Sequence, residues 1–261
     1  MRGRKYVYWS KARALRLALS LLVLVILVRQ VFLRNYEGVF LCVLTLLLFG
    51  VPNFITEKTG IDLPTMLEGI SYCFIFAAEI LGELNSFYTR IPYWDTMLHT
   101  LNGFLMAAIG FALVDICNRS ERFSMKLSPL FLALVAFCFS MTVGVLWEFF
   151  EFFMDSYFGT DMQKDWIIQT IHSVTLNPDG LNHAVHVPVQ SLVVNGEDWI
   201  AKYGGYLDIG LIDTMKDLIV NFIGAVVFSC IGFFYVKNRG QGGFAGQFIP
   251  RVKKDRKNEQ K

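Results

Sequence analysis

Three short groups of polar residues lie at the ends of long apolar stretches of this chain. They contain five carboxylates, one His and one Asn: Asp95 and His99, then Glu148 and Glu151, then Asp213, Asp217 and Asn221. Ionisable side chains at membrane depth are costly and usually mark a functional site. Carboxylates joined by an imidazole could hold a divalent cation or share protons, and either chemistry requires the three groups to meet.

Asp95 and His99 are four residues apart and therefore share one face of a helix. An Asp one turn before a His can orient the imidazole ring and raise its basicity, or it can supply a second metal ligand. The alternative is structural, with Asp95 capping the helix and His99 hydrogen-bonded to a neighbouring helix. The spacing alone leaves both interpretations open.

Glu148 and Glu151 are three residues apart and also lie at neighbouring positions of one helix face. Counted from Leu130, Glu148 lies ~27 Å along the helix, inside the boundary of a ~30 Å hydrocarbon core. We therefore predict that Glu148 is within the membrane. For Glu151, and for Asp155 one turn further, a solvated helix end is an equally simple explanation.

Asp213, Asp217 and Asn221 follow one another at intervals of four residues and form a continuous stripe. Gly224 lies one turn further, close to the same line. The helix dipole favours an Asp in the first turn, and this accounts for Asp213 alone. A polar stripe along a membrane helix should face the interior of the helix bundle. We predict that Asp217 and Asn221 do so.

The elements that must position these groups are membrane-spanning helices. Hydrophobic residues make up 54% of the 261 residues, charged residues make up 18%, and the mean hydropathy is +0.45. The apolar stretches are close to the ~20 residues that cross a bilayer. We predict an all-α, six-helix polytopic membrane protein with a single membrane domain over residues 1–236. The predicted spans are 14–33, 38–55, 66–84, 97–117, 128–154 and 214–236.

The basic residues predict the orientation. Of the 24 Lys and Arg residues, 18 fall in the N-terminal segment, two alternate loops and the tail, and six fall on the opposite side. Because positive charge favours the cytoplasmic side, both termini are predicted to be cytoplasmic. The segment 156–213 then forms an extracytoplasmic lid, and the three polar groups lie at the outer leaflet. The basic tail, 237–261, is predicted to be disordered.

The predicted lid contains two local patterns and three of the four His residues. The run DWIIQTIHSV could form a short interfacial helix, and VPVQSLVVNGEDW predicts a β-hairpin that turns at Asn195-Gly196. His183 and His186 could share a metal ion if their segment were helical. Nothing else in the sequence supports a role for them or for His172.

If the polar groups converge, their charges need compensation. Four or more carboxylates cannot all be ionised in a dry pocket, so shared protons, a basic partner such as Arg90, or a cation must be present. We expect that this cofactor, if the site has one, is a divalent metal ion. The predicted metal ligands are Asp95, His99, Glu148 and Asp217; the candidate catalytic set adds Glu151 and Asn221, with Asp213 and Glu79 in secondary positions.

Composition and motifs exclude some other functions. The net charge is only +2, so no global field indicates a nucleic acid partner. The five Cys residues are separated and lie in or beside apolar stretches, where small packing residues are expected. The sequence contains no HExxH, no GxSxG and no phosphate-binding glycine motif.

Three runs of the sequence resemble the YjdF-type bacterial inner-membrane proteins, an uncharacterised family: YWDTMLHTLNGF, VLWEFFEF and DTMKDLIVNFIGA. More remotely they are similar to the VanZ-like proteins, in which an Asp and a His open one membrane helix, an acidic residue closes the next, and D-x-x-x-N-x-x-G opens the last. The residues that match this pattern are Asp95 and His99, Glu148 and Glu151, and Asp217, Asn221 and Gly224. The resemblance covers about residues 79–232. It implies a multi-pass protein of the bacterial cytoplasmic membrane with a polar site, and it implies no particular reaction.

Three functions fit these observations. The chain could be an envelope-facing enzyme or binding protein for a lipid-linked or cell-wall substrate, a small ion-coupled transporter, or a non-catalytic membrane partner whose acidic residues serve helix packing. Transporters usually show inverted repeats or helices broken at mid-membrane, and neither is evident in the sequence. Clustering at one depth favours a site over packing. Whether the chain is an enzyme stays open at this point, as do its substrate and oligomeric state.

Overall fold

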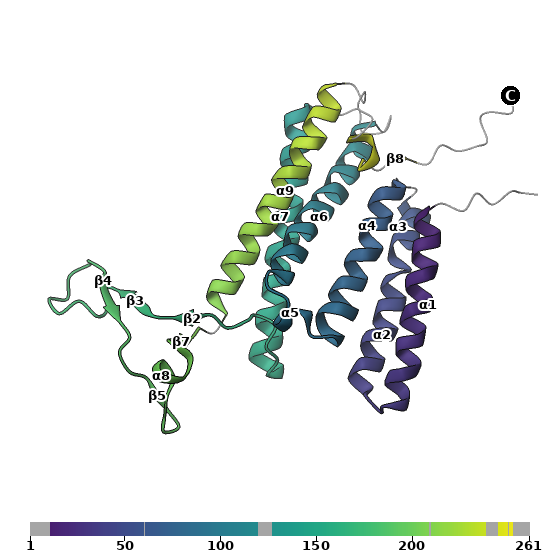
Figure 1. Cartoon of the computed structure of the whole chain (residues 1–261). Helices are drawn as coiled ribbons and strands as arrows, with labels where there is room; N and C mark the ends of the chain where they lie inside the picture. The colour runs from purple at the N-terminus through teal and green to yellow at the C-terminus, as the bar shows by residue number, and fades with distance from the viewer. Residues whose placement is uncertain are drawn as a thin grey trace, which may run out of the picture. The chain divides into compact units, whose positions relative to one another are not determined.

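The computed structural model describes residues 11–59, 61–119, 127–208, 210–238, 245–249 and 251–252. These residues are mostly helical (Figure 1). The helices are α1 (Lys11–Phe32), α2 (Tyr36–Leu48), α3 (Val51–Thr59), α4 (Thr65–Phe76), α5 (Phe87–Arg90), α6 (Trp94–Arg119), α7 (Pro129–Phe158), α8 (Trp199–Tyr203) and α9 (Leu211–Lys237). A π-helical segment, Ala77–Leu84, continues α4, and a 3₁₀ turn spans Ala245–Gln247.

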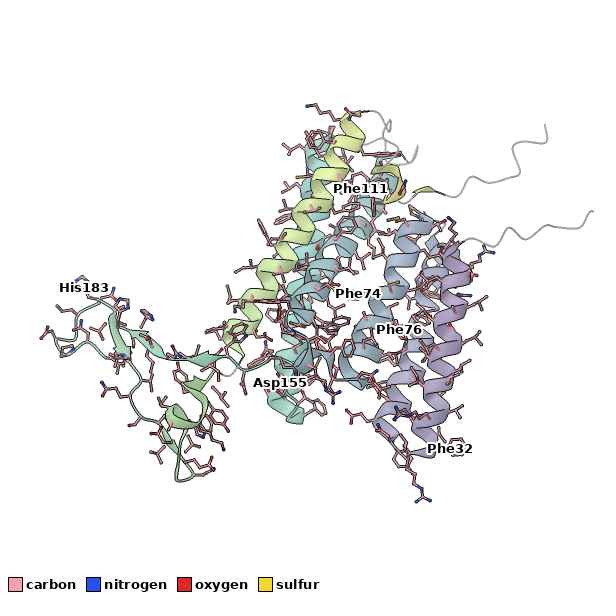
Figure 2. The ribbon with its side chains drawn as sticks, in the orientation of Figure 1. Phe32, Phe74, Phe76, Phe111, Asp155 and His183 are labelled. Carbon is pink, nitrogen blue, oxygen red and sulfur yellow. The ribbon has the colours of Figure 1, made fainter. Side chains whose placement is uncertain are left out.

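Six helical segments among the described residues are long and apolar enough to cross a membrane: Lys11–Phe32, Tyr36–Lys58, Thr65–Leu84, Trp94–Asp115, Pro129–Phe158 and Leu211–Lys237. Many of their large apolar side chains point outward; Phe32, for example, is 83% exposed (Figure 2). An apolar surface of this extent marks contact with lipid. The predicted all-α, six-helix membrane architecture is confirmed, and each span lies within a few residues of its predicted place.

The chain divides into two compact units. The larger comprises Met1–Gly144 with Ile219–Lys261, and the smaller comprises Val145–Leu218. Two helices, α7 and α9, pass from one unit to the other without a break. Most of the membrane-spanning sequence therefore belongs to the larger unit, whereas the loop between α7 and α9 belongs to the smaller one.

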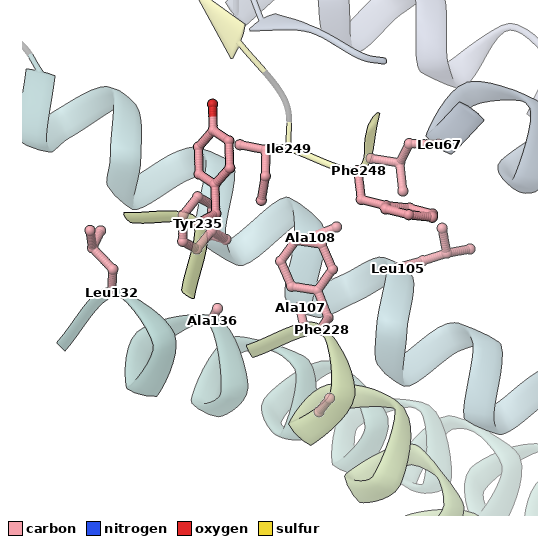
Figure 3. Packing of buried hydrophobic residues seen from close by; sticks show 12 residues of the cluster. Leu67, Leu105, Ala107, Ala108, Leu132, Ala136, Phe228, Tyr235, Phe248 and Ile249 are labelled. Carbon is pink, nitrogen blue, oxygen red and sulfur yellow. The ribbon is translucent and has the colours of Figure 1, made fainter. Parts of the chain in front are cut away.

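Two apolar cores hold the larger unit together. One lies among α4, α6, α7 and α9 (Figure 3). There, Phe104 of α6 packs edge-to-face on Phe228 of α9 at 5.1 Å between ring centroids, and Phe137 of α7 packs on Phe222 of α9 at 5.3 Å. The second core joins α1, α2 and α4. These ring contacts fix α9 against both α6 and α7.

Part of the C-terminal tail is packed against the helices. Phe248 and Ile249 are buried in the core of Figure 3, and Ile249 is 0% exposed. Strand β8 (Arg251–Val252) pairs with β1 (Ile61–Asp62) in an antiparallel ladder. For these residues the prediction of a disordered tail is wrong, because the two adjacent apolar side chains of Phe248 and Ile249 are buried in the core. The rest of the predicted tail lies outside the described residues.

The smaller unit contains three antiparallel two-stranded ladders within the described part of the chain. They pair β2 (Ile167–Ile168) with β7 (Tyr206–Leu207), β3 (Thr170–Ser173) with β4 (Val185–Pro188), and β5 (Val193–Val194) with β6 (Glu197–Asp198). Asn195 and Gly196 connect the last pair with φ angles of 52° and 85°. Positive φ at both positions is what a tight two-residue hairpin requires. The predicted hairpin turn is confirmed.

The predicted interfacial helix in this unit is wrong. The run DWIIQTIHSV forms β2 and β3, whose main-chain groups pair with β7 and β4. A strand needs a partner from elsewhere in the chain, and the partners here are 12 or more positions away in the sequence. Local periodicity does not report such a partner, so a short apolar run is ambiguous between helix and strand.

Candidate functional site

Three membrane helices meet around the side chain of Asn221 in α9. Asn102 Nδ2 of α6 donates to Asn221 Oδ1 over 3.3 Å, and Asn221 Nδ2 donates to the Ser140 carbonyl of α7 over 3.5 Å. Ser140 Oγ in turn donates to the Gly103 carbonyl of α6 over 2.7 Å. Asn221 is 1% exposed. Since a buried polar group is costly unless it is hydrogen-bonded, this network fixes how α6, α7 and α9 pack.

Glycines allow the three helices to approach this closely. A methyl group at Gly103 would overlap the backbone carbonyl of Asn221, and one at Gly144 would lie 2.7 Å from Asn221 Nδ2. One turn further along α9, a methyl group at Gly224 would overlap the Thr100 carbonyl of α6. Small residues of this kind are typical of tight contacts between membrane helices. We name the following residues the Asn221 junction: Asn102, Gly103, Ser140, Gly144 and Asn221.

Asp95 and His99 lie in the first two turns of α6. His99 Nε2 is 3.6 Å from Asp95 Oδ1. The imidazole is the more buried of the two side chains. The i, i+4 spacing thus produces the contact expected from it. In this position the carboxylate can orient the imidazole ring.

Glu148 and Glu151 of α7 are both buried, at 4% and 7% exposed. Trp147 Nε1 donates to Glu151 Oε1 over 2.8 Å. A solvated helix end is therefore the wrong explanation for Glu151, because its carboxylate is packed and hydrogen-bonded. Asp155, one turn further, accepts a hydrogen bond from the Met162 N–H over 2.7 Å and helps to end the helix. Two buried carboxylates within one turn require compensation of their charge.

Asp213 ties the segment after α7 to the start of α9. Its Oδ2 accepts from the Lys164 N–H over 2.7 Å, and its Oδ1 accepts from Trp166 Nε1 over 3.3 Å. Next to it, Gln163 Nε2 donates to Thr214 Oγ1 over 2.6 Å. The Asp213 carboxylate thus has a positioning role in the smaller unit, in addition to its favourable place at a helix N-terminus.

The remaining predicted residues are Asp217 and Glu79. Asp217 is buried, one turn before Asn221 in α9. Glu79 is half-buried in the π-helical segment Ala77–Leu84, and such segments occur frequently at functional sites. The structure brings Asp95 to His99 and joins Asn221 to α6 and α7. The convergence of all the predicted site residues stays a prediction.

Sequence reasoning missed the partners of Asn221. Asn102 and Ser140 supply hydrogen bonds to the junction, and Gly144 supplies the space for it. The available signal was their polarity or small size inside apolar stretches, since membrane-helix interfaces are enriched in such residues.

Residues 14–238 match the family described as Predicted membrane protein (DUF2238). The chain belongs to this family. The match extends over the helices of both units and agrees with the YjdF-type resemblance of the three motif runs. The remoter similarity to VanZ-like proteins stays a prediction.

A relative from Thermotoga maritima, described as an uncharacterized protein, is 28% identical over 107 residues. The aligned part is 41% of this chain and 53% of that protein, so the chain spans about half the length of this relative. No solved structure matches the chain.

Proposed function

We propose that this protein is a bacterial cytoplasmic-membrane protein that binds a lipid-linked or cell-envelope substrate at an acidic, histidine-containing site on the outer leaflet. The observation that carries the proposal is the Asn221 junction. It puts α6, α7 and α9, which bear the three polar groups, in direct contact at one level.

The spacing of the ionisable residues along their helices supports a position on the same side of this junction. Within the larger unit α6 and α9 run parallel, and α7 runs antiparallel to them (Figure 1). His99 lies one turn before Gly103 in α6, and Asp217 lies one turn before Asn221 in α9. In α7, Glu148 lies one turn after Gly144. Each is thus about 6 Å along its own helix from the junction, in the same direction. We infer that the three side chains reach one depth and form one site.

A divalent cation is the natural partner of such a site. Asp95, Glu148, Glu151 and Asp217 would bring four carboxylates to one imidazole, and a bound cation would offset their repulsion. Oxygen ligands with one nitrogen suit a hard or borderline ion such as Mg²⁺ or Mn²⁺. An anionic headgroup, such as a phosphate of a lipid-linked substrate, would bind through that ion. Asn221 would hold the helices in place and not touch the substrate.

Thermal unfolding tests the cation site. Mn²⁺ should raise the melting temperature of the detergent-solubilised protein in a concentration-dependent way, by mass action on the folded state. Glu148→Gln and Asp217→Asn should abolish that shift and leave the cation-free protein as stable or more stable, because each removes charge with little change in size. Asp179→Asn, in an exposed loop, should keep the shift. An unchanged Mn²⁺ response in both site variants would favour a packing role for the acidic residues.

Crosslinking tests the convergence of the helices. A pair of His99→Cys and Asp217→Cys should crosslink with a short reagent in membranes. The matched control combines His99→Cys with Ile219→Cys, two residues further along α9, where the side chain is exposed. Equal crosslinking of both pairs, or of neither, would contradict a shared site.

The orientation is tested by labelling in intact cells. A Cys introduced at Gly180 should react with an impermeant reagent, and one introduced at Ser120 should not, as the distribution of basic residues predicts. Reaction of both from outside would move the site away from the outer leaflet.

A further inference from the structure

The β3–β4 hairpin places two histidines directly opposite each other. In the ladder, His172 of β3 pairs with His186 of β4. Their ring centroids are 4.2 Å apart and the ring planes are at 90°. Both side chains are exposed. His183, labelled in Figure 2, precedes β4 and lies outside the paired strands.

The backbone of the hairpin holds this pair in register. The segment that connects the strands closes around Asn177, whose amide Nδ2 donates to the His183 carbonyl over 3.0 Å. The side-chain oxygen of Asn177 accepts from the Asp179 N–H over 2.9 Å. Residues directly opposite in an antiparallel ladder have Cβ atoms about 4.5–5.5 Å apart. The two imidazoles therefore project from the same face of the hairpin, and their Cβ atoms are close together.

We propose that His172 and His186 form a surface site for a nitrogen-preferring transition-metal ion such as Zn²⁺ or Cu²⁺. Neutral imidazole suits these ions among the first-row metals. At Zn–N distances of about 2.0–2.1 Å, tetrahedral ligand nitrogens are roughly 3.4 Å apart. Rings with centroids 4.2 Å apart reach that spacing by side-chain rotation, which is open to exposed residues.

The rest of the coordination shell is open. The next pair on the same face is Thr170 with Pro188, and neither is a carboxylate, thiolate or imidazole. Water or a small external ligand would complete the coordination, so binding is reversible. A metal ion that links β3 to β4 would also stabilise a two-stranded hairpin, an element that is marginal by itself.

This site is chemically distinct from the carboxylate site proposed above and does not depend on it. Two nitrogen donors favour Zn²⁺ or Cu²⁺, whereas Mg²⁺ prefers oxygen. His99 is the remaining histidine of the chain and belongs to the other site. A His99 variant therefore separates the two proposals, because it changes the carboxylate site and leaves His172 and His186 intact.

Calorimetric titration of the full-length protein in detergent with Zn²⁺ tests the proposal. His172→Phe and His186→Phe each keep an aromatic ring opposite the partner and remove the ligand nitrogens. Each should lose one Zn²⁺ per chain, or bind it at least about tenfold more weakly, the lower end of what a lost supporting residue costs a metal site. His183→Ala and His99→Ala should keep this ion, and Mg²⁺ should not compete for it.

Hydrogen exchange supplies the second measurement. Zn²⁺ should slow exchange of the backbone amides of β3 and β4 in the wild type and in His183→Ala, but not in His172→Phe. Acid should remove the effect, because imidazole must be neutral to bind a metal. Equal Zn²⁺ binding by His172→Phe and the wild type would overturn the proposal. An equal loss in His183→Ala and His172→Phe would overturn the assignment to the cross-strand pair.

Discussion

Gly103→Ala should loosen the packing of α6 against α9. The new methyl group would overlap the backbone carbonyl of Asn221, and Gly224→Ala would do the same to the Thr100 carbonyl. A backbone carbonyl within a helix cannot rotate away from the new methyl group, whereas the end of a long side chain can. To restore ordinary contact distances the two helices must separate by about 1 Å. That displacement would also weaken the contact between Phe104 and Phe228.

The expected loss of unfolding free energy in Gly103→Ala is the difference between two opposing effects. Overpacking of a tightly packed site costs typically about 1–3 kcal/mol. Alanine offsets up to about 1 kcal/mol of this through its better helix propensity. A net loss of about 1–2 kcal/mol in unfolding free energy corresponds to a melting temperature lower by roughly 2–8 °C for a chain of this size. Gly144→Ala meets the side-chain nitrogen of Asn221, which can shift, so its effect should be smaller.

Thermal melts of detergent-solubilised variants measure this series. Gly69→Ala is the matched control, since a methyl group there would lie 3.7 Å from Leu15 Cδ2, an ordinary contact. We expect Gly103→Ala and Gly224→Ala to melt lowest, Gly144→Ala between them and the wild type, and Gly69→Ala at or above the wild type. If Gly103→Ala melted as high as Gly69→Ala, the close packing of the Asn221 junction would be refuted.

Three further predictions concern the smaller unit. Asp213→Ala removes the acceptor of two hydrogen bonds and should cost about 1–3 kcal/mol, seen as faster hydrogen exchange over residues 162–167. Partial desolvation and the charges of Asp161 and Asp208 raise the pKa of Asp165, so the folded state holds that proton more tightly than the unfolded state. Stability from this group should therefore be highest in acid and fall as the pH rises through the raised pKa, and Asp165→Asn should remove this part of the pH dependence of the melt. Lys202→Ala breaks an exposed ion pair with Glu197 and should leave the melting temperature unchanged.

The sequence alone determined the environment of the chain and the contacts that depend on short spacing. Apolar stretches of membrane-crossing length predicted six helices, because a helix satisfies the backbone hydrogen bonds of a spanning segment within that segment. The contact of Asp95 with His99 followed from one helical turn, and the turn at Asn195-Gly196 followed from residues that accept positive φ. Each of these features depends on neighbours within a few residues.

The tertiary structure decided which distant residues these elements meet. In the sequence, Asn221 is one member of a polar stripe. Its packing against Gly103 and Gly144 depends on how three helices are arranged, which only the structure shows. The strands of DWIIQTIHSV and the pairing of His172 with His186 likewise depend on partners that local periodicity does not contain. The spacing of residues along one segment fixes which of them share a face. What that face touches is set by the packing of the whole chain, where long-range hydrogen bonds and close contacts outweigh local preference.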